Sequence, residues 1–334
     1  MRRGFITGVL DLFSGAGGFS RGFADAGFEI IMGIDSDRNA IRSFKANFPG
    51  AVALQEDIQE IDPGDIISIL GARPRIIIGG PPCEPFTGAN PERMKEPLDR
   101  LYKDPMGKLV LHFIRIVSEL EPEVFIMENV PAIMHSPIKE AIEDLFRRSG
   151  YPEIYFNVLK AEEHGTPSKR TRVFISNIKI DPPKSDKRIT VEEALADLPP
   201  PGDGSIPNHE YISISARKMR KISKIRKGRS LYLYEGAGGR MLPNYIRLDP
   251  NDIAPTVMGS SRFIHPYEDR ILTVREQARL MGFPDDHVFM GGKDDQFNQV
   301  GEAVPPPLAR SMAEEVKKIL GISDSKPELR IKFV

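Results

Sequence analysis

The sequence predicts an α/β protein with a doubly covered, largely parallel sheet and a smaller irregular module inserted near its middle. Over the first 180 residues, short apolar runs alternate with segments of helical periodicity, which is typical of strands connected by helices. From residue 181 to residue 245, proline clusters and glycines replace long apolar runs, and apolar helical segments then return. We therefore expect a catalytic and ligand-binding domain over 1–180, a separate module over 181–245, and a return to the first domain over 246–334.

The elements follow in order from these patterns. Strands are expected at the apolar runs 9–13, 29–35, 51–57, 75–80, 123–129, 154–161 and 172–180. Helices are expected where apolar residues recur at helical spacing, over 20–26, 38–48, 107–120, 138–148, 273–281 and 308–320. The last residues are predicted to form a tail.

Composition excludes several classes of protein. The 334 residues are 40% hydrophobic and 28% charged, which is ordinary globular composition, and the formal net charge is -1. Any basic footprint for nucleic acid must therefore be local. One cysteine makes neither an internal disulfide nor a multi-thiolate zinc site, and we expect no metal. The N-terminal apolar run is short and Asp11 breaks it, so we expect a cytoplasmic protein without a signal peptide or membrane helix.

The first strand leads into a glycine-rich turn, Asp11 to Phe19. Such a turn lets a ligand approach the backbone closely, although a tight strand–helix connection needs the same glycines. Gly15 and Gly17 fit the dinucleotide fingerprint, but Ser20 stands at the third glycine position. This disfavours a nicotinamide-dependent dehydrogenase.

Two further strands end in carboxylates, Asp35 and Asp57. Each acid alone is more often a strand-end or cap residue. Ligands of such sheets bind at the carboxyl ends of the strands, where Asp35 is suited to ribose hydroxyls and Asp57 to an adenine amino group. The glycine turn and the two acids together favour an adenosine-containing ligand.

Three later segments carry reactive groups. Cys83 lies between prolines on a loop rather than in an apolar element, which favours a reactive thiol over a structural one. The loop over 89–107 is long and charged, as a lid would be. Glu128 ends the fifth strand. Arg170 and Arg172 precede the last strand with a spacing that points both the same way, suited to a phosphate or a carbonyl oxygen, or to a solvated edge.

The irregular module holds a local basic cluster. Between residues 211 and 240 there are nine basic side chains against one acid, Glu235. The nine are Arg217, Lys218, Arg220, Lys221, Lys224, Arg226, Lys227, Arg229 and Arg240. Such a cluster suits phosphate contact, with a solvated surface as the alternative.

Taken in order, these segments resemble the cytosine carbon-5 DNA methyltransferases of the Dcm-like, restriction–modification type. The matching segments span nearly the whole chain: 11–19, 79–86, 128–130, 169–174, 254–257, 273–285 and 301–306. The resemblance implies an S-adenosylmethionine-dependent methyltransferase fold of Rossmann-like type, with a target-recognition region over 181–245. It also implies double-stranded DNA as substrate, a monomer, and a possible partner restriction endonuclease.

The resemblance implies a role for each matched residue. Cys83 matches the nucleophile that attacks carbon 6 of a flipped cytosine. Glu128 matches the residue that contacts ring nitrogen 3, and Arg172, beside Arg170, the one that holds the carbonyl oxygen and lowers the pKa of the thiol. The positions implied to bind S-adenosylmethionine are Phe13, Ser14, Gly15, Gly17, Gly18, Asp35, Ser36, Asp57, Ile58, Pro81 and Glu302.

Four positions depart from the family pattern. Glu84 and Met281 stand where Gln is usual or frequent, and Ser168 replaces a usual Gln. Glu302 replaces the Asn of the Gly-Asn-Ala-Val segment, so a carboxylate lies where the methionine part of the donor is expected. That carboxylate can repel the donor's carboxylate or pair with its ammonium group.

Two other functions remain open on the sequence. One is a transfer-RNA cytosine methyltransferase, but that branch of the family carries a Cys-Phe-Thr segment that a chain with a single cysteine at Cys83 lacks. The other is a DNA-binding protein with weak or lost catalysis, which Glu302 favours and the intact Cys83, Glu128 and Arg172 disfavour.

Overall fold

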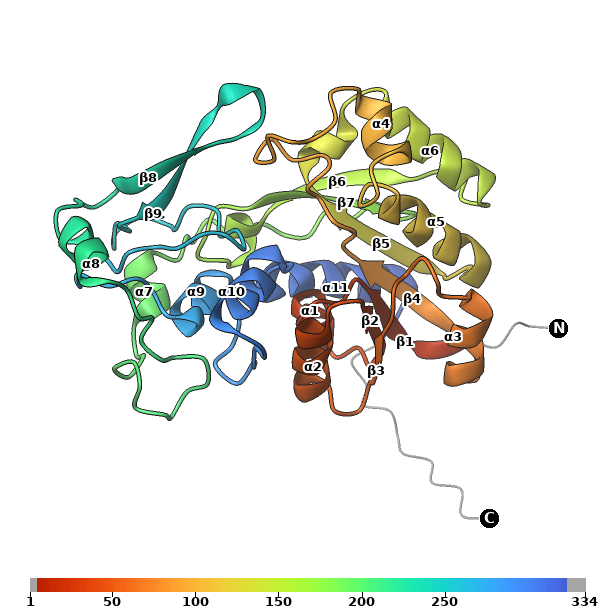
Figure 1. Ribbon diagram of the computed structural model, residues 1–334. Helices are drawn as coiled ribbons and strands as arrows, with labels where there is room; N and C mark the ends of the chain where they lie inside the picture. The colour runs from red at the N-terminus through yellow and green to blue at the C-terminus, as the bar shows by residue number, and fades with distance from the viewer. Residues whose placement is uncertain (1–4, 323–334) are drawn as a thin grey trace, which may run out of the picture.

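A seven-stranded sheet forms the centre of the computed structural model, which describes residues 5–322 (Figure 1). The strand order is β3-β2-β1-β4-β5-β7-β6. The strands are β1 (Phe5–Leu12), β2 (Ile30–Asp35), β3 (Val52–Gln55), β4 (Arg73–Gly79), β5 (Val124–Asn129), β6 (Tyr155–Lys160) and β7 (Thr171–Ser176). All seven predicted strands are present; six start within two residues of the expected position, and β1 starts four residues earlier. The predicted C-terminal tail lies outside the described residues.

One strand departs from the predicted parallel sheet. β7 pairs antiparallel with both β5 and β6, while the other six strands run parallel. Only ten residues, 161–170, join β6 to β7, with one short 3-10 turn among them. A parallel connection needs a crossover of a dozen or more residues, so this short link reverses the chain.

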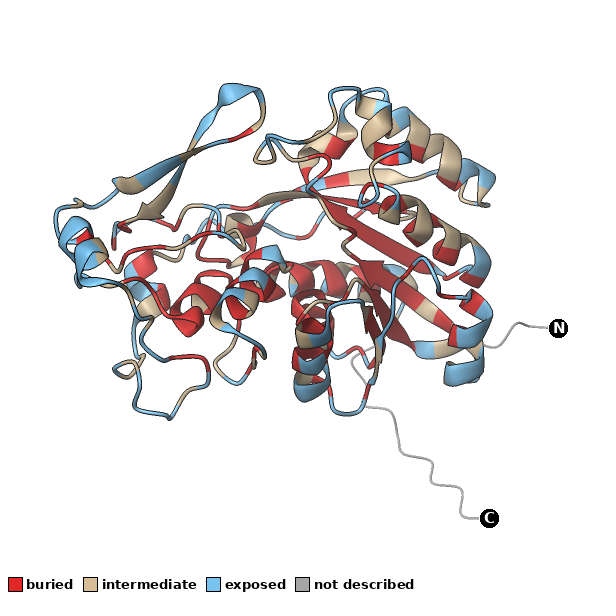
Figure 2. Ribbon diagram, in the orientation of Figure 1, coloured by how far each residue is buried: buried red, intermediate tan, exposed pale blue. Residues whose placement is uncertain are grey.

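Helices cover both faces of the sheet. On one face lie α3 (Pro63–Leu70), α5 (Leu109–Leu120) and α6 (Ile138–Arg148). On the other lie α1 (Gly18–Asp25), α2 (Arg38–Asn47) and α11 (Pro306–Leu320). Successive residues of a strand point to opposite faces, so Ile77 packs in the first layer while Ile76 and Ile78 pack in the second. Figure 2 shows the central strands buried along almost their whole length.

The rest of the chain forms a second part beside the sheet. It contains α7 (Val191–Leu195), α8 (Ala216–Ile222), the antiparallel hairpin of β8 (Ser230–Glu235) and β9 (Met241–Ile246), α9 (Val274–Leu280) and α10 (Lys293–Glu302). α4 (Pro97–Tyr102) lies in the loop after β4. Figure 2 shows α8 largely exposed and the hairpin half-buried or exposed, whereas α9 is buried.

Buried arginines hold the irregular backbone of this second part. Arg247 donates to the carbonyl oxygens of Ile222, Ile225, His265 and Glu268 at 2.7–3.0 Å, and to the carboxylate of Asp269 at 2.6 Å. Irregular segments have few ladder partners for their carbonyl groups, and a guanidinium with five N–H donors supplies them.

No helix in the described part of the chain combines the length and the apolar character needed to cross a membrane.

Candidate functional site

The reactive residues meet at the carboxyl edge of the sheet. β4 and β5 are neighbouring parallel strands, so the loop that carries Cys83 and the end of β5 that carries Glu128 lie side by side. A Cβ placed on Gly80 would lie only 3.2 Å from Glu128 Oε2. Because β7 runs antiparallel, its first residues reach the same edge, and Arg172 enters the site from there.

The loop that carries Cys83 is fixed at both ends of the thiol-bearing turn. Asn129 Nδ2 donates to the carbonyl oxygen of Pro81 at 3.1 Å, and the backbone N–H groups of Phe86 and Thr87 donate to the carbonyl oxygen of Cys83 at 3.0 and 2.9 Å. The Cys83 side chain is half-buried.

Arg172 lowers the pKa of the Cys83 thiol, as expected, but two other effects outweigh it. Burial, and then the charge of Glu128, raise the pKa of Cys83 to about 11, although Arg172 and Arg170 lower it. In the protein by itself the thiol is therefore protonated at neutral pH. Thiolate formation requires a change in the charges around it.

Arg172 and Glu128 form an ion pair in this site. Arg172 Nε lies 2.8 Å from Glu128 Oε1, and both side chains are about nine-tenths buried. Glu128 is thereby held against the loop of Cys83, and an ionised partner compensates its charge.

Arg170 has different contacts, although the sequence groups it with Arg172. Its guanidinium is buried and donates to the carbonyl oxygens of Val257 and Gly301, each at 2.9 Å, and of Glu302 at 3.3 Å. These bonds tie the start of β7 to the segment before α10 and to the end of α10. In this structure Arg170 organises the walls of the site.

The glycine-rich turn between β1 and α1 is held at several points. Gly15 N donates to Asp35 Oδ2 at 2.8 Å. Gly17, at φ 88°, leaves no room for a Cβ, which would lie 2.4 Å from the ring of Phe48. At Gly15 (φ 54°), by contrast, no atom lies within 4 Å of where a Cβ would stand. The turn therefore presents an open backbone surface.

Ser14 supplies a second sign that this turn accepts a ligand. Its Oγ is buried and has no hydrogen-bond partner within residues 5–322. Buried hydroxyl groups in native proteins are nearly always paired, so this one is suited to a polar group of a bound molecule.

Three residues around this turn were not singled out by sequence reasoning as site residues. Asp11 is buried, and burial raises the pKa of its carboxyl to about 7. Ser20, at the position of the missing third glycine, donates its hydroxyl to Asp11 Oδ2 at 2.6 Å. His287 is buried, and its Nε2 lies 2.9 Å from the carbonyl oxygen of Ala16. The polar Ser20 in the fingerprint was the one available signal.

The other predicted ligand positions lie along the same edge. Gly18 starts α1, and a Cβ on it would lie only 2.7 Å from the carbonyl oxygen of Val304. Ser36 and Asp57 are exposed after β2 and β3, and Asp57 Oδ1 accepts the backbone N–H of Gln59 at 3.0 Å. Ile58 and Pro81 are buried, and Phe13 is half-buried at φ 60°.

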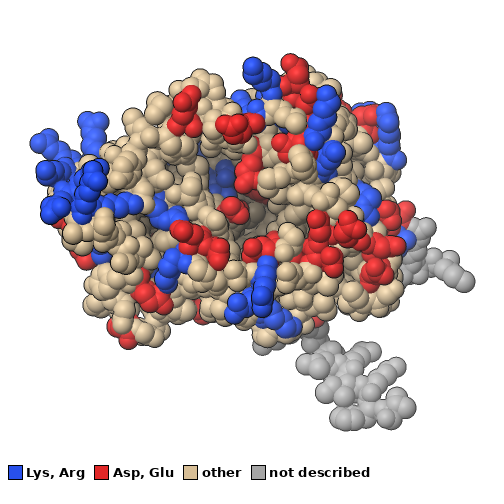
Figure 3. Space-filling model, in the orientation of Figure 1, with Lys and Arg blue, Asp and Glu red and all other residues tan. Residues whose placement is uncertain are grey.

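The four departures from the family pattern occur as two pairs. In the first pair, Ser168 Oγ donates a hydrogen bond to Met281 Sδ over 3.9 Å. Glu302 ends α10 with a pKa raised to about 7, chiefly by burial and then by the charges of Glu84 and Asp35. Figure 3 shows a hollow at the centre of this face with acidic side chains along its rim. A site with this charge favours a cationic ligand group.

The basic cluster lies away from this hollow. Four of its residues are on α8, four follow in the loop to β8, and Arg240 is at the tip of the hairpin. All except Lys218 are exposed, and Figure 3 shows a group of Lys and Arg at the left-hand end, where α8 lies in Figure 1. The hairpin tip reaches back to the site, since Ala237 N donates to the carbonyl oxygen of Gly88 at 2.9 Å. This contact places the hairpin tip, which carries Arg240, beside the loop that follows Cys83.

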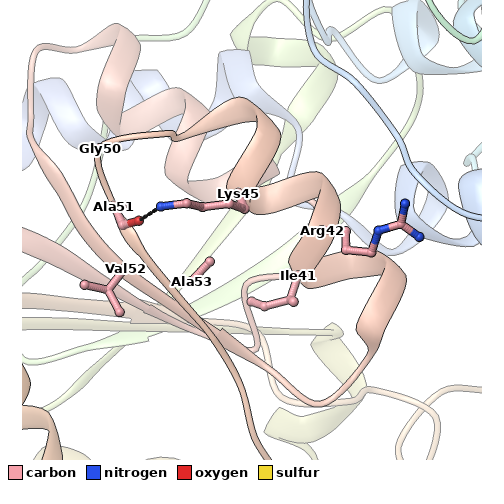
Figure 4. Close-up of a pocket in the computed structure, with 7 residues that line it drawn as sticks. All are labelled: Ile41, Arg42, Lys45, Gly50, Ala51, Val52 and Ala53. Carbon is pink, nitrogen blue, oxygen red and sulfur yellow. Dashed lines mark hydrogen bonds between the residues drawn. The ribbon is translucent and has the colours of Figure 1, made fainter.

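A depression of about 570 Å³ lies elsewhere, between α2 and β3 (Figure 4). Lys45 Nζ donates there to the carbonyl oxygens of Ala51, at 2.8 Å, and Pro49, at 3.1 Å. Lys45 thus closes the α2–β3 connection, and none of the predicted site residues lines this depression. Across residues 5–322 there is also no group of three or more His, Cys, Asp or Glu side chains placed to hold a metal ion.

Comparison with known proteins gives one consistent family. The family model described as C-5 cytosine-specific DNA methylase matches residues 7–318. M.MJ0563P of Methanocaldococcus jannaschii, named as a candidate type II methyltransferase, is 48% identical over 317 residues, covering 93% of this chain and 99% of that protein. The type II methyltransferase M1.HphI of Haemophilus parahaemolyticus is 35% identical, covering 93% of this chain and 86% of its own.

A solved structure agrees with these relatives. The crystal structure of a candidate DNA modification methyltransferase from an E. coli prophage superposes with a TM-score of 0.76 at 30% identity. The match covers 95% of this chain and all of that one.

Proposed function

Since this chain belongs to the family of C-5 cytosine-specific DNA methylases, we propose that it methylates carbon 5 of a cytosine flipped out of a short duplex target, through a covalent bond to Cys83. The observation that carries this proposal is the convergence of Cys83, Glu128 and Arg172 at one edge of the sheet, beside an open glycine-rich turn.

The covalent route answers a chemical need. Carbon 5 of cytosine is a poor nucleophile. When Cys83 Sγ bonds to carbon 6, the electron pair of the 5,6 double bond becomes available at carbon 5, which takes the methyl group. The proton on carbon 5 then leaves, the 5,6 double bond re-forms, and the thiolate is expelled from carbon 6. The thiol returns unchanged, and one proton is released in each turnover.

Glu128 and Arg172 stabilise the charge that thiolate attack places on the ring. We propose that Glu128 contacts nitrogen 3 and the exocyclic amine while Arg172 holds the carbonyl oxygen. The Glu128 charge raises the pKa of Cys83. Contact between Glu128 and the base would weaken this effect and lower the pKa of the thiol, so substrate binding and thiol activation are coupled.

The methyl donor that fits the glycine-turn site is S-adenosylmethionine, which supplies an electrophilic methyl group. The unpaired Ser14 Oγ and the open surface at Gly15 suit its amino-acid part, and Asp35 its ribose. We propose that Glu302 pairs with its ammonium group. Burial is the main cause of the raised pKa of Glu302, but the charges of Glu84 and Asp35 raise it further, and a cation would relieve that repulsion.

Duplex DNA is the proposed substrate, and the basic cluster is proposed to contact its phosphates. An extruded base is required because carbon 6 cannot be reached within the stack. We further propose that the protein acts as a monomer and protects DNA from a separate endonuclease of the same target, as in the restriction–modification setting of its type II relatives.

One variant and one substrate analogue test this function. Cys83→Ala is expected to abolish methyl transfer to random-sequence duplex DNA, read by deamination sequencing, while duplex binding stays within about threefold. A duplex with 5-fluorocytosine at the target is expected to form a covalent adduct with the wild-type protein, because fluorine cannot leave as a proton, and none with Cys83→Ala.

The opposite outcomes separate the alternatives. Full turnover by Cys83→Ala would refute the covalent mechanism. Methylation of transfer RNA but not of duplex DNA would identify the RNA enzyme, and DNA binding without any methylation would identify a catalytically inactive homologue.

A further inference from the structure

The glycine-rich turn rests on a group of aromatic rings with one histidine among them. The ring centroid of His287 lies 4.7 Å from that of Phe283, 5.2 Å from that of Phe289 and 6.5 Å from that of Phe48. The turn contacts the same group, since a Cβ on Gly17 would lie 2.4 Å from the ring of Phe48. His287 has no exposed surface. Burying an imidazole costs solvation that a phenyl ring would not lose, so its polar atoms must have a use here.

One contact distinguishes this histidine from a phenyl ring. His287 Nε2 lies 2.9 Å from the carbonyl oxygen of Ala16, whereas Nδ1 has no hydrogen-bond partner within residues 5–322. Burial lowers the pKa of His287 to about 3, so the ring is neutral at neutral pH and carries a single N–H group. Because a carbonyl oxygen only accepts, that proton lies on Nε2, and His287 donates to the turn.

The accepting carbonyl group belongs to the part of the turn that is open to a ligand. Ala16 follows Ser14, whose Oγ is unpaired, and Gly15, where no atom lies within 4 Å of a Cβ position. Asn47 Nδ2 also donates to the Ala16 oxygen, but over 3.5 Å, so the bond from His287 is the shorter one. A hydrogen bond to this oxygen fixes the plane of the peptide group and with it the direction of the turn.

The segment that carries His287 is held on both sides. Val288 N donates to Asn47 Oδ1 at 2.8 Å, and Asn47 Nδ2 donates to the carbonyl oxygen of Val288 at 2.9 Å. Asn208 makes the same pair of bonds with the backbone of Phe289, at 2.9 and 2.8 Å. A donor whose own backbone is fixed in this way can hold the turn in one position.

From these contacts we propose that His287 is a positioning residue for the methyl donor: its Nε2–H group holds the carbonyl group of Ala16 and keeps the glycine-rich turn in the arrangement that accepts the donor's amino-acid part. This inference rests on the proposed function, because it takes S-adenosylmethionine as the ligand of the turn. His287 acts through the turn, not by contact with the donor. A turn that is already ordered loses less conformational entropy on binding, so loss of the bond should weaken affinity for the donor and not slow transfer from bound donor.

Four full-length variants separate this role from a contribution to packing. His287→Leu and His287→Asn remove the donor at the Nε2 position, because leucine has no N–H group and the shorter asparagine places its amide near the position of Nδ1. His287→Gln keeps an N–H donor near the position of Nε2. Phe289→Leu is the matched packing control, since it alters the same aromatic group and leaves the bond to Ala16 in place.

The measurement is calorimetric binding of S-adenosylhomocysteine, the demethylated form of the donor, to the protein without DNA, with thermal midpoints recorded for each variant. His287→Leu and His287→Asn are expected to bind about tenfold more weakly, as loss of one buried hydrogen bond predicts. His287→Gln and Phe289→Leu should stay within about threefold of the wild type, whatever their thermal midpoints. In methylation assays, His287→Leu should raise KM for S-adenosylmethionine while kcat stays within about twofold.

The outcomes distinguish this inference from the proposed function. Equal affinities of the wild type, His287→Leu and His287→Asn would overturn the inference alone. An equal loss of affinity in Phe289→Leu would also overturn it, because packing would then explain the effect. The expected order of affinities in a protein that methylates no DNA would refute the proposed methyl transfer and still support the role of His287. A wild-type protein that binds no S-adenosylhomocysteine would refute both.

Discussion

Arg172 Nε lies 2.8 Å from Glu128 Oε1, and the two side chains act on the Cys83 thiol in opposite directions. Burial raises the pKa of that thiol most, Glu128 raises it further, and Arg172 lowers it. Burial and the Glu128 charge thus outweigh Arg172 and keep the nucleophile protonated at neutral pH. Such a site protects a half-buried thiol from reaction in the absence of DNA.

Glu128→Gln should therefore make Cys83 more reactive while it removes methyl transfer. Loss of the carboxylate charge lowers the pKa of the thiol, and each unit of that shift raises the thiolate fraction about tenfold. Alkylation of Cys83 by iodoacetamide between pH 7 and 10 measures this directly, because the chain has no other thiol. Arg172→Gln should shift the alkylation profile to higher pH.

Glu84→Gln serves as the control, since Glu84 is the last of the charges that raise the pKa of Cys83. It should shift the alkylation profile less than Glu128→Gln does. Slower alkylation of Glu128→Gln than of the wild type would contradict the coupling between Glu128 and the thiol.

Glu302 should make stability depend on pH. Its folded pKa of about 7 lies above the ordinary 4.5, so the folded protein retains a proton that the unfolded chain has released. The free energy of unfolding therefore falls as pH rises from about 4.5 to about 7. Glu302→Gln removes this dependence, and its denaturant midpoint should exceed that of the wild type at pH 8 but equal it near pH 4.5.

The comparison isolates Glu302 because Asp11, whose pKa is also raised to about 7, is present in both proteins. Glu84→Gln should also raise the denaturant midpoint at pH 8, though by less than Glu302→Gln does, since the charge of Glu84 contributes to the raised pKa of Glu302. If the denaturant midpoints of Glu302→Gln and the wild type differed by the same amount at every pH, ionisation of Glu302 would not be the cause of the difference in stability.

Arg247→Met should destabilise the second part of the chain by about 3 kcal/mol or more. The substitution removes the donor of four carbonyl groups, one of them in a fully buried hydrogen bond, and of the half-exposed Asp269 carboxylate, and each buried polar group left unsatisfied costs about 1–3 kcal/mol. Urea unfolding at equilibrium measures the change. Arg229→Met, an exposed basic residue in the adjoining loop, should change stability by no more than about 0.5 kcal/mol. Equal losses in the two variants would mean that the buried network of Arg247 contributes little.

The sheet and its flanking helices, apart from α3, were predictable because their apolar residues recur with a regular period. In β4, Ile76, Ile77 and Ile78 pack alternately in the two helical layers. Because both faces are buried, the sequence of this strand is one continuous apolar run. By contrast, α8, α10 and the β8–β9 hairpin were not predicted. β8 exposes Tyr232 and Leu233 on both of its faces, and α10 is mostly polar, so neither carries a clear period.

The sequence by itself determined the residue types of the site and their order, since short motifs at strand ends require those residues in place. Cys83, Glu128, Arg172 and the glycine turn all lie at the edge where they were expected. Only the tertiary structure decided their individual environments. It separated Arg170, which binds backbone carbonyls, from Arg172, which binds Glu128, although the two stand two residues apart. It also set the net direction of the Cys83 pKa shift: Arg172 lowers the pKa, as expected, but burial and Glu128 outweigh it. Burial and the distance between charges depend on segments far apart in the chain, and no local pattern encodes them.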